Sequence, residues 1–256
     1  MDKTQQGSVT VQIINGLATI EFFHPAHNSL PSKLLKELAD TILEYGSREE
    51  VILILLKSRG DRTFCAGASF DELVAIDSKT NGKKFFMGFA NVINAIRTCG
   101  KIVIGRVQGK AVGGGVGLAS AVDYCFATKY ASVKLSELAV GIGPFVIGPA
   151  VQRKTSLSAF SHMALNATEW QSAEYAKSNG LYFEVFESTE EMDDRIHSFC
   201  ETLCGMNPEA LNRLKTVFWE GTDNWDKLLE ERAEISGDLV LSRFSKETIA
   251  GFLNKQ

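Results

Sequence analysis

The chain has 256 residues, of which 45% are hydrophobic and 23% are charged, as in ordinary soluble globular proteins with a sizeable core. A formal net charge of −4 with scattered Lys and Arg argues against a nucleic-acid partner. The polar start and the lack of a long apolar run argue against a secretion signal and a membrane partner, so we expect a cytoplasmic protein. Five cysteines without Cys-x-x-Cys spacing predict neither disulfides nor a zinc site, and we expect no metal.

The first half of the chain alternates between strand and helix patterns. Residues 9–14 and 17–22 flank Asn15-Gly16 and predict a β-hairpin with a tight turn. A helical stripe then ends near Gly46, and the apolar run 51–56 is typical of a buried strand. Further on, the patterns predict helices at 85–98 and 115–121 and strands at 102–107 and 123–127. This alternation favours parallel strands joined by helical crossovers, with ligand-binding groups on the loops that follow the strands.

The second half is predicted to be largely helical. Gly180, Gly205 and Asn207-Pro208 separate the segments. The predicted helices cover residues 158–165, 173–179, 189–204, 208–219 and 226–236, and a short strand is expected within 181–186.

The run from Gly109 to Ala119 is the most informative feature of the sequence. Its three successive glycines, 113 to 115, allow a sharp turn and a close approach of a ligand to the backbone N–H groups. These N–H groups open a predicted helix, whose unpaired donors and partial positive charge suit a carbonyl oxygen that gains negative charge during a reaction. The alternative is that the glycines only allow a helix to pack closely on a strand. The run matches neither a P-loop nor the dinucleotide-binding pattern.

A second glycine-bearing turn, residues 63–73, follows the strand predicted at 51–56. With this turn, the chain resembles the crotonase family, also called the enoyl-CoA hydratase/isomerase family, over nearly its full length. The resemblance is carried by Pro25 with Asn28-Ser29-Leu30, Phe64-Cys65-Ala66-Gly67-Ala68, Gly109 to Ala119, Asp123 with Ala127, Glu137 with Gly141, Ala173-Glu174 with Gly180-Leu181, Asn207-Pro208 with Lys215, and the tail 244–252.

The resemblance implies an α/β fold, a crotonase-like superhelix of stacked ββα turns with a C-terminal helical region. Residues 1–195 would form the core with the acyl-CoA site, and residues 196–256 a helical trimerisation region. We therefore expect a homotrimer or hexamer that acts on an acyl-CoA or enoyl-CoA thioester. Coenzyme A would be part of the substrate, and no separate cofactor is expected.

The resemblance also assigns the site. In this family two backbone N–H groups hold the thioester oxygen, and by position these belong to Ala68 and Gly114; Glu137 would be the acid/base residue. The predicted substrate-binding residues are Ala66, Ala68, Ser69, Phe70, Asp71, Gly113, Gly114 and Phe145. For Phe70, the alternative is a helix anchor in the core. Asp123 is similar to a family aspartate that holds structure near the site, and no motif activates the Cys65 thiol.

The family's hydratases usually carry a glutamate at each of two positions. In this sequence Gly117 stands at the first position, and only the second, Glu137, has a carboxylate. One carboxylate is enough to move a proton between two carbons, so we favour an isomerase-like shift of a double bond, with the pKa of Glu137 raised by apolar neighbours. The bulky segment 143–149 should reshape the acyl end of the site, with a contact at Phe145 or Val146. The alternatives are an enoyl-CoA hydratase that holds water in another way, thioester hydrolysis, and a non-catalytic acyl-CoA-binding subunit.

Overall fold

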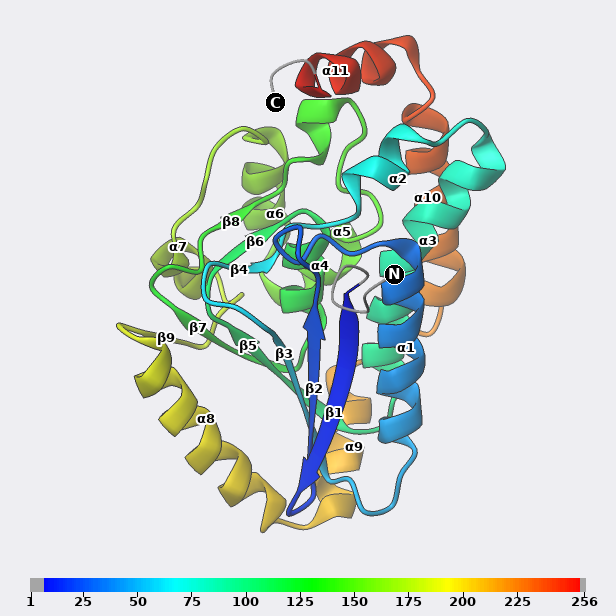
Figure 1. The fold of residues 1–256 in the computed structure, drawn as a ribbon. Coiled ribbons are helices and arrows are strands. Elements are labelled where there is room, and N and C mark those ends of the chain that lie inside the picture. Colours follow the sequence, from blue (N-terminus) through cyan, green and yellow to red (C-terminus); the bar gives the residue numbers. More distant parts are fainter. Residues whose placement is uncertain (1–6, 254–256) are drawn as a thin grey trace.

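The computed structural model describes residues 7–253 and contains two β-sheets surrounded by helices (Figure 1). The larger sheet has the order β1-β2-β3-β5-β7-β9. The predicted hairpin is confirmed: β1 (Ser8–Ile14) pairs antiparallel with β2 (Leu17–Phe23) across Asn15-Gly16. The remaining strands, β3 (Leu53–Ser58), β5 (Ile102–Val107), β7 (Tyr124–Thr128) and β9 (Glu184–Phe186), run parallel, as the alternation of patterns predicted.

The smaller sheet was not predicted. It consists of the parallel strands β4 (Thr63–Cys65), β6 (Lys110–Val112) and β8 (Val133–Lys134). Strands of two or three residues are too short to show a period in the sequence. Each follows a strand of the larger sheet, so the pairs β3/β4, β5/β6 and β7/β8 place one strand in each sheet before the chain enters a helical segment. This arrangement confirms the predicted fold of stacked ββα turns.

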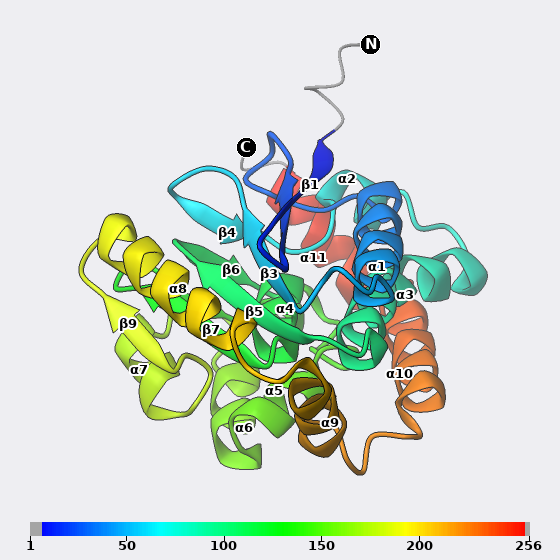
Figure 2. The same cartoon turned by 90° about the horizontal axis from the view of Figure 1, so that it is seen from below.

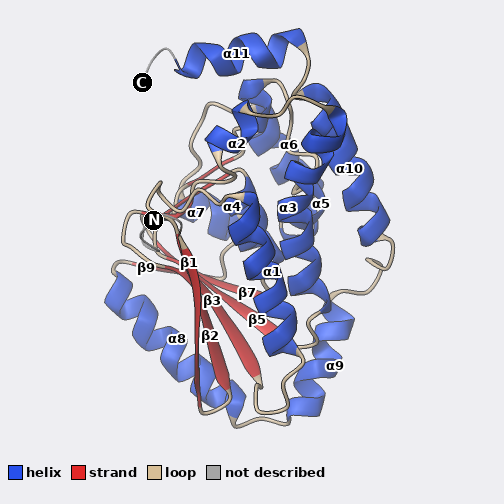
Figure 3. Ribbon diagram, turned by 45° about the vertical axis from the view of Figure 1, so that its right-hand side comes forward, coloured by secondary structure: helices blue, strands red, loops and turns tan. Residues whose placement is uncertain are grey.

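Helices cover both faces of the larger sheet. Helices α1 (Ser32–Gly46) and α3 (Lys79–Thr98) lie on one face, and α8 (Thr189–Cys204) lies on the other (Figure 3). Leu211 of α9 (Pro208–Phe218) joins the core cluster at α8. Side chains alternate between these faces along β3, because Ile54 and Leu56 join the cluster under α1 and α3 while Leu53 and Leu55 face α8. The predicted boundary between residues 195 and 196 falls within α8 and stays a prediction.

The other helical segments are α2 (Phe70–Val74), α4 (Gly114–Ala121), the 3₁₀ turn η2 (Glu137–Val140), α5 (Gly148–Lys154), α6 (Leu157–Leu165), α7 (Ala173–Ser178), α10 (Trp225–Leu239) and α11 (Arg243–Leu253). The predicted start of α3 at residue 85 was wrong: the helix begins at Lys79, because the Ser78 Oγ accepts a hydrogen bond from the Asn81 N–H at 3.3 Å and caps it. Between residues 7 and 253 no helix is long and apolar enough to cross a membrane.

The C-terminal helices are fixed to the core at two places. Helix α10 runs alongside α3 (Figure 2), where Gly82 and Gly237 bring the two backbones into contact. Helix α9 and the residue after it are held by Asp123, which follows α4: its carboxylate accepts hydrogen bonds from Lys215 Nζ at 2.6 Å and Trp219 Nε1 at 2.8 Å.

Candidate active site

Three loops meet at the carboxyl ends of the smaller sheet. Because β4, β6 and β8 are parallel, the turns that follow them lie on one edge, and they border a cavity of about 430 Å³. Residues 66–68 follow β4, Gly113 and Gly114 follow β6, and Ser136 and Glu137 follow β8. The structure therefore brings together seven of the nine predicted site residues on this cavity: Ala66, Ala68, Phe70, Gly113, Gly114, Glu137 and Phe145.

The turn that contains Ala68 is held by an earlier loop. The Leu30 N–H donates to the Gly67 carbonyl at 2.8 Å, and the Ser69 N–H donates back to the Leu30 carbonyl at 3.1 Å. The buried Asn28 fixes this loop, since its Nδ2 donates to the carbonyls of Arg59 and Thr63, both at 2.9 Å. These contacts give a structural reason for the Asn28-Ser29-Leu30 motif: it positions the Ala68 turn.

The glycine turn after β6 requires glycine on both conformational and steric grounds. Gly113 has φ 51° and ψ −116°, a conformation that side chains rarely adopt. A Cβ on Gly115 would lie 2.3 Å from the Cys65 carbonyl oxygen, and one on Gly114 would lie 2.3 Å from the ring of Phe89. The structure therefore shows the close packing of a helix on a strand that was the alternative interpretation of these glycines, and the same turn also borders the cavity.

The two turns adjoin, and each offers a free backbone donor. A Cβ built on Gly67 would lie 3.7 Å from the Gly114 nitrogen. The hydrogen bonds of these turns use the N–H groups of Leu30, Ser69 and Gly113. Within residues 7–253, the N–H groups of Ala68 and Gly114 donate to no other group. Gly114 is also the first residue of α4, where the helix dipole is positive.

Glu137 places a carboxyl group at the cavity. Its carboxyl faces the glycine turn, because a Cβ on Gly113 would lie 3.0 Å from Glu137 Oε1. The second oxygen, Oε2, is buried and has no hydrogen-bond partner in the described part of the chain. Burial raises the pKa of Glu137 to about 7. A carboxyl with this pKa can both accept and donate a proton near neutral pH.

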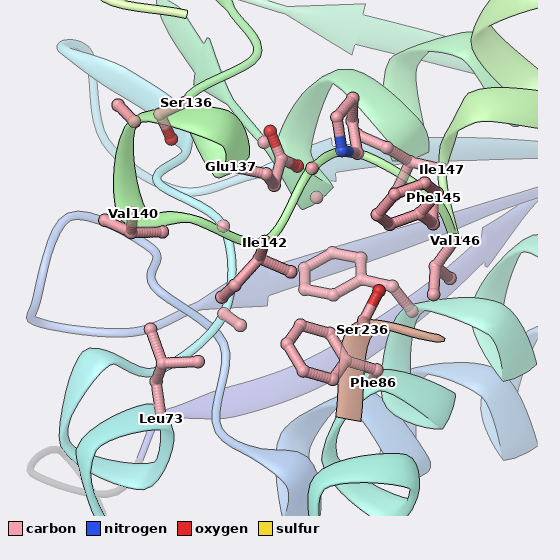
Figure 4. Close-up of a pocket in the computed structure, with 18 of the residues that line it drawn as sticks. Leu73, Phe86, Ser136, Glu137, Val140, Ile142, Phe145, Val146, Ile147 and Ser236 are labelled. Atoms are coloured by element: carbon pink, nitrogen blue, oxygen red, sulfur yellow. The ribbon is translucent and has the colours of Figure 1, made fainter. Parts of the chain in front are cut away.

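Apolar side chains form most of the remaining wall (Figure 4). Glu137 lies near Phe145 and Ile147, with Phe86 and Ser236 across the cavity. Phe145 and Val146 both line the cavity, and their contact with an acyl group stays a prediction. Phe70 also lines the cavity and packs against the buried cluster of Ile142, Val240 and Ile249, so it contributes to the wall and to a small core cluster.

Two predicted residues lie outside the wall. Ser69 caps α2, its Oγ accepting from the Glu72 N–H at 3.4 Å, and Asp71 is exposed in the first turn of that helix. Their contact with a CoA arm stays a prediction. Burial raises the pKa of Cys65 to about 12, so its thiol is not an activated nucleophile.

Several wall residues were missed from the sequence. Phe85, Phe86 and Phe89 come from α3, and their spacing within a predicted helix was a usable signal. Ser236 comes from α10, and nothing local in the sequence marks it as part of the site. Ile147 lies in the segment 143–149, which was predicted to shape the site, but the residue itself was not singled out.

Comparison with known proteins decides the family. The sequence model described as "Enoyl-CoA hydratase/isomerase" matches residues 12–256. The chain belongs to the enoyl-CoA hydratase/isomerase family. This confirms the resemblance read from the motifs, and it identifies the protein as an enzyme of that family, acting on CoA thioesters.

Relatives within this family carry different activities in their names. The peroxisomal Delta(3,5)-Delta(2,4)-dienoyl-CoA isomerase of Arabidopsis thaliana is 27% identical over 236 residues, covering 84% of this chain and 83% of the relative. The short-chain-enoyl-CoA hydratase of Clostridium acetobutylicum is 26% identical over an alignment that covers 98% of this chain and 94% of the relative. The crystal structure of an enoyl-CoA hydratase from Bacillus halodurans has a TM-score of 0.88 at 20% identity, over 95% of this chain and 99% of that one, which shows the shared fold.

Proposed function

We propose that this enzyme shifts a carbon–carbon double bond of an enoyl-CoA thioester. The observation that carries the proposal is the composition of the cavity. Among the described residues that line it, Glu137 is the only one with a carboxyl, imidazole or thiol group. A single carboxylate with a pKa of about 7 suits a proton shuttle, in which one group removes a proton and returns it.

In the proposed reaction, the Glu137 carboxylate removes a proton from C2 of a 3-enoyl-CoA. The C2–H electron pair moves into the thioester, which becomes a dienolate, and the N–H groups of Ala68 and Gly114 stabilise its oxygen. The protonated Glu137 then returns the proton to C4, so that the double bond moves from C3–C4 to C2–C3. The similarity to the Arabidopsis dienoyl-CoA isomerase supports this assignment.

The test is turnover of a 3-enoyl-CoA, followed by the rise of conjugated enoyl-thioester absorbance. Glu137→Gln should lower kcat by about 10²- to 10⁴-fold, the usual contribution of a general acid/base. The matched control is Glu169→Gln, at an exposed glutamate that does not line the cavity. Undiminished turnover by Glu137→Gln would exclude Glu137 as the proton carrier.

Hydration is the second candidate, because the Clostridium relative is named a hydratase. It is measured in parallel as the loss of conjugated absorbance from crotonyl-CoA. Hydration by the wild-type chain without isomerisation would replace our proposal. Binding of CoA thioesters with no turnover of any kind would favour the non-catalytic binder.

We also propose a homotrimer, or a hexamer of two trimers, as the assembly. Exposed apolar side chains on α6 and α9, namely Leu157, Leu165, Leu214, Val217 and Phe218, support subunit contacts. Sedimentation equilibrium gives the subunit number directly, and a monomer at micromolar concentration would contradict the proposal.

A further inference from the structure

The space beside Gly117 is filled by the side chain of Ile147. A Cβ built on Gly117 would lie 2.5 Å from Ile147 Cγ2 and 2.8 Å from Ile147 Cβ. The other nearest atom, Ile93 Cδ1, is 3.8 Å away. Gly117 and Ile147 are both buried, and Ile147 also lines the cavity. The missing side chain at position 117 has therefore not left an empty pocket: an apolar side chain from a different loop occupies it.

Ile147 cannot easily give up this space. The clash with Gly117 involves the Ile147 Cβ itself, which moves only with the backbone, and a β-branched side chain has few allowed rotamers. The backbone is held from both sides: the Gly148 N–H donates to the Pro144 carbonyl at 2.9 Å, and the Val151 N–H donates to the Ile147 carbonyl at 3.0 Å. Ile147 is therefore a fixed part of the wall.

The cavity offers few partners for an ordered water. Apart from Glu137, the polar side chains among its described lining residues are Lys134, Ser136, Thr168 and Ser236. The Lys134 Nζ lies 4.7 Å from the centre of the Trp170 ring, the Ser236 Oγ already donates to the Arg232 carbonyl, and the Thr168 Oγ1 donates to Glu169 Oε1 at 3.5 Å. Ser136 is the one of these four side chains with no such contact among the described residues. A buried water needs about two to four polar partners. Ile147 fills the space beside Gly117, so that no second polar group can bind a water opposite Glu137 from there.

We infer that Ile147 excludes water from the reacting end of the cavity, and that the pair Gly117 and Ile147 confines Glu137 to proton transfer. Ile147 is thus a specificity-determining residue, which acts by shape and not by chemistry. The inference rests on the proposed isomerisation, because it explains why the proton removed from the substrate returns to it and why water does not add to the double bond.

The first experiment is isomerisation of a 3-enoyl-CoA in D₂O. In a dry cavity, the proton on Glu137 returns to C4 before it exchanges with solvent, so the wild-type product should contain little deuterium at C4. Ile147→Ala opens the wall and should raise the deuterium content severalfold. Ile196→Ala is the matched control, because Ile196 is as deeply buried as Ile147 but belongs to the core cluster at α8 and does not line the cavity. It should not raise the deuterium content.

The second experiment restores the missing carboxylate. Gly117→Glu alone should gain no hydratase activity, because its side chain meets Ile147. In the double variant Gly117→Glu/Ile147→Gly, the water oxygen can bond to C3 while one carboxylate takes its proton and C2 receives a proton from the other. We expect hydration of crotonyl-CoA to rise about a hundredfold above wild type, as is usual for a general acid/base group.

The outcomes separate the inference from the proposed function. Full deuterium exchange in wild type, unchanged by Ile147→Ala, would overturn the inference and leave isomerisation standing. Hydration of crotonyl-CoA by wild type without isomerisation would overturn both, and hydration beside isomerisation would overturn the inference alone. If wild type shows neither activity, isomerisation fails, and the double variant decides alone: gained hydration supports the role of Ile147, and a double variant with a native circular dichroism spectrum but no hydration overturns it.

Discussion

Glu137 has the one carboxyl group among the described residues that line the cavity. The residue as a whole is half-buried, but its Oε2 is buried without a partner among the described residues. The surroundings of the carboxyl, and not the exposure of the whole residue, set its pKa. Burial disfavours the charged form and raises this pKa from 4.5 to about 7.

The raised pKa predicts the pH dependence of catalysis. Proton removal from C2 requires the carboxylate form of Glu137 in the free enzyme. We expect kcat/KM for a 3-enoyl-CoA to rise with pH and reach half its maximum near pH 7, the pKa of this group. A pH–rate profile from about pH 5 to 9 measures it, and a rate independent of pH across this range would contradict the assignment.

The same shift predicts a pH-dependent cost to folding. The unfolded chain loses the Glu137 proton near pH 4.5, whereas the folded chain keeps it until about pH 7. The native state is therefore destabilised progressively as pH rises between these values, by up to about 3 kcal/mol. Glu137→Gln should be more stable than wild type at about pH 8, and the difference should vanish toward about pH 4. Urea denaturation at several pH values measures the difference; equal stability at high pH would argue for a normal carboxyl.

At the scale of elements, the crossing of α3 and α10 shapes one part of the cavity wall. A Cβ on Gly237 would lie 2.6 Å from the Lys83 nitrogen, and one on Gly82 would lie 2.8 Å from the Gly237 Cα. The backbones therefore touch, and only glycine allows this approach. The contact brings Ser236 of α10 and Phe86 of α3 to the same cavity.

Gly237→Ala should force these two helices apart. Because the added methyl group meets backbone atoms, it cannot be accommodated by a side-chain rotation, and we expect a loss of about 1–3 kcal/mol in the free energy of unfolding. The displaced wall should also raise KM for the acyl-CoA. Thermal denaturation and steady-state kinetics test both effects. Gly251→Ala is the control, since a Cβ there meets nothing within 4 Å; equal melting temperatures for the two variants would contradict the close crossing.

At the scale of the whole molecule, one buried ion pair joins the sheet to the C-terminal helices. The side chains of Asp123 and Lys215 are each 3% exposed, and their charged atoms are 2.6 Å apart. The Asp123 carboxylate also accepts from the Val103 N–H at 2.7 Å and from Trp219 Nε1. Asp123 therefore connects β5, α9 and the residue after α9, and it does not line the catalytic cavity. This agrees with its predicted structural role.

Lys215→Met should leave the Asp123 charge buried and unpaired. Breaking a buried pair on one side typically costs about 3–5 kcal/mol, and we expect a loss of this size in urea denaturation. Replacing Asp123 by Asn in the Lys215→Met background removes the orphaned charge and keeps one acceptor oxygen, for either the Val103 N–H or Trp219 Nε1, so it should recover part of the loss. A stability change below about 1 kcal/mol in the single variant would show that the pair is not structurally important.

The local features of the chain could be read from its sequence. The hairpin at Asn15-Gly16, the buried strand at β3 and the glycine turn at residues 113–115 follow from backbone preferences and hydrophobic periodicity, which neighbouring residues determine. The motifs also sufficed to identify the family, and the sequence alone showed that Glu137 keeps its carboxylate where Gly117 has none.

Only the tertiary structure decided what surrounds that carboxylate. The smaller sheet leaves no periodic signal, Ser69 caps a helix that was not predicted, and Ser236 reaches the cavity from a distant helix. The contact of Ile147 with Gly117 joins residues 30 positions apart through the packing of α4 against the start of α5. Such neighbours are set by how whole elements pack, a property that no short segment of sequence contains. The sequence thus determined which of the two positions keeps a carboxyl group, and the packing decided which side chains surround that group.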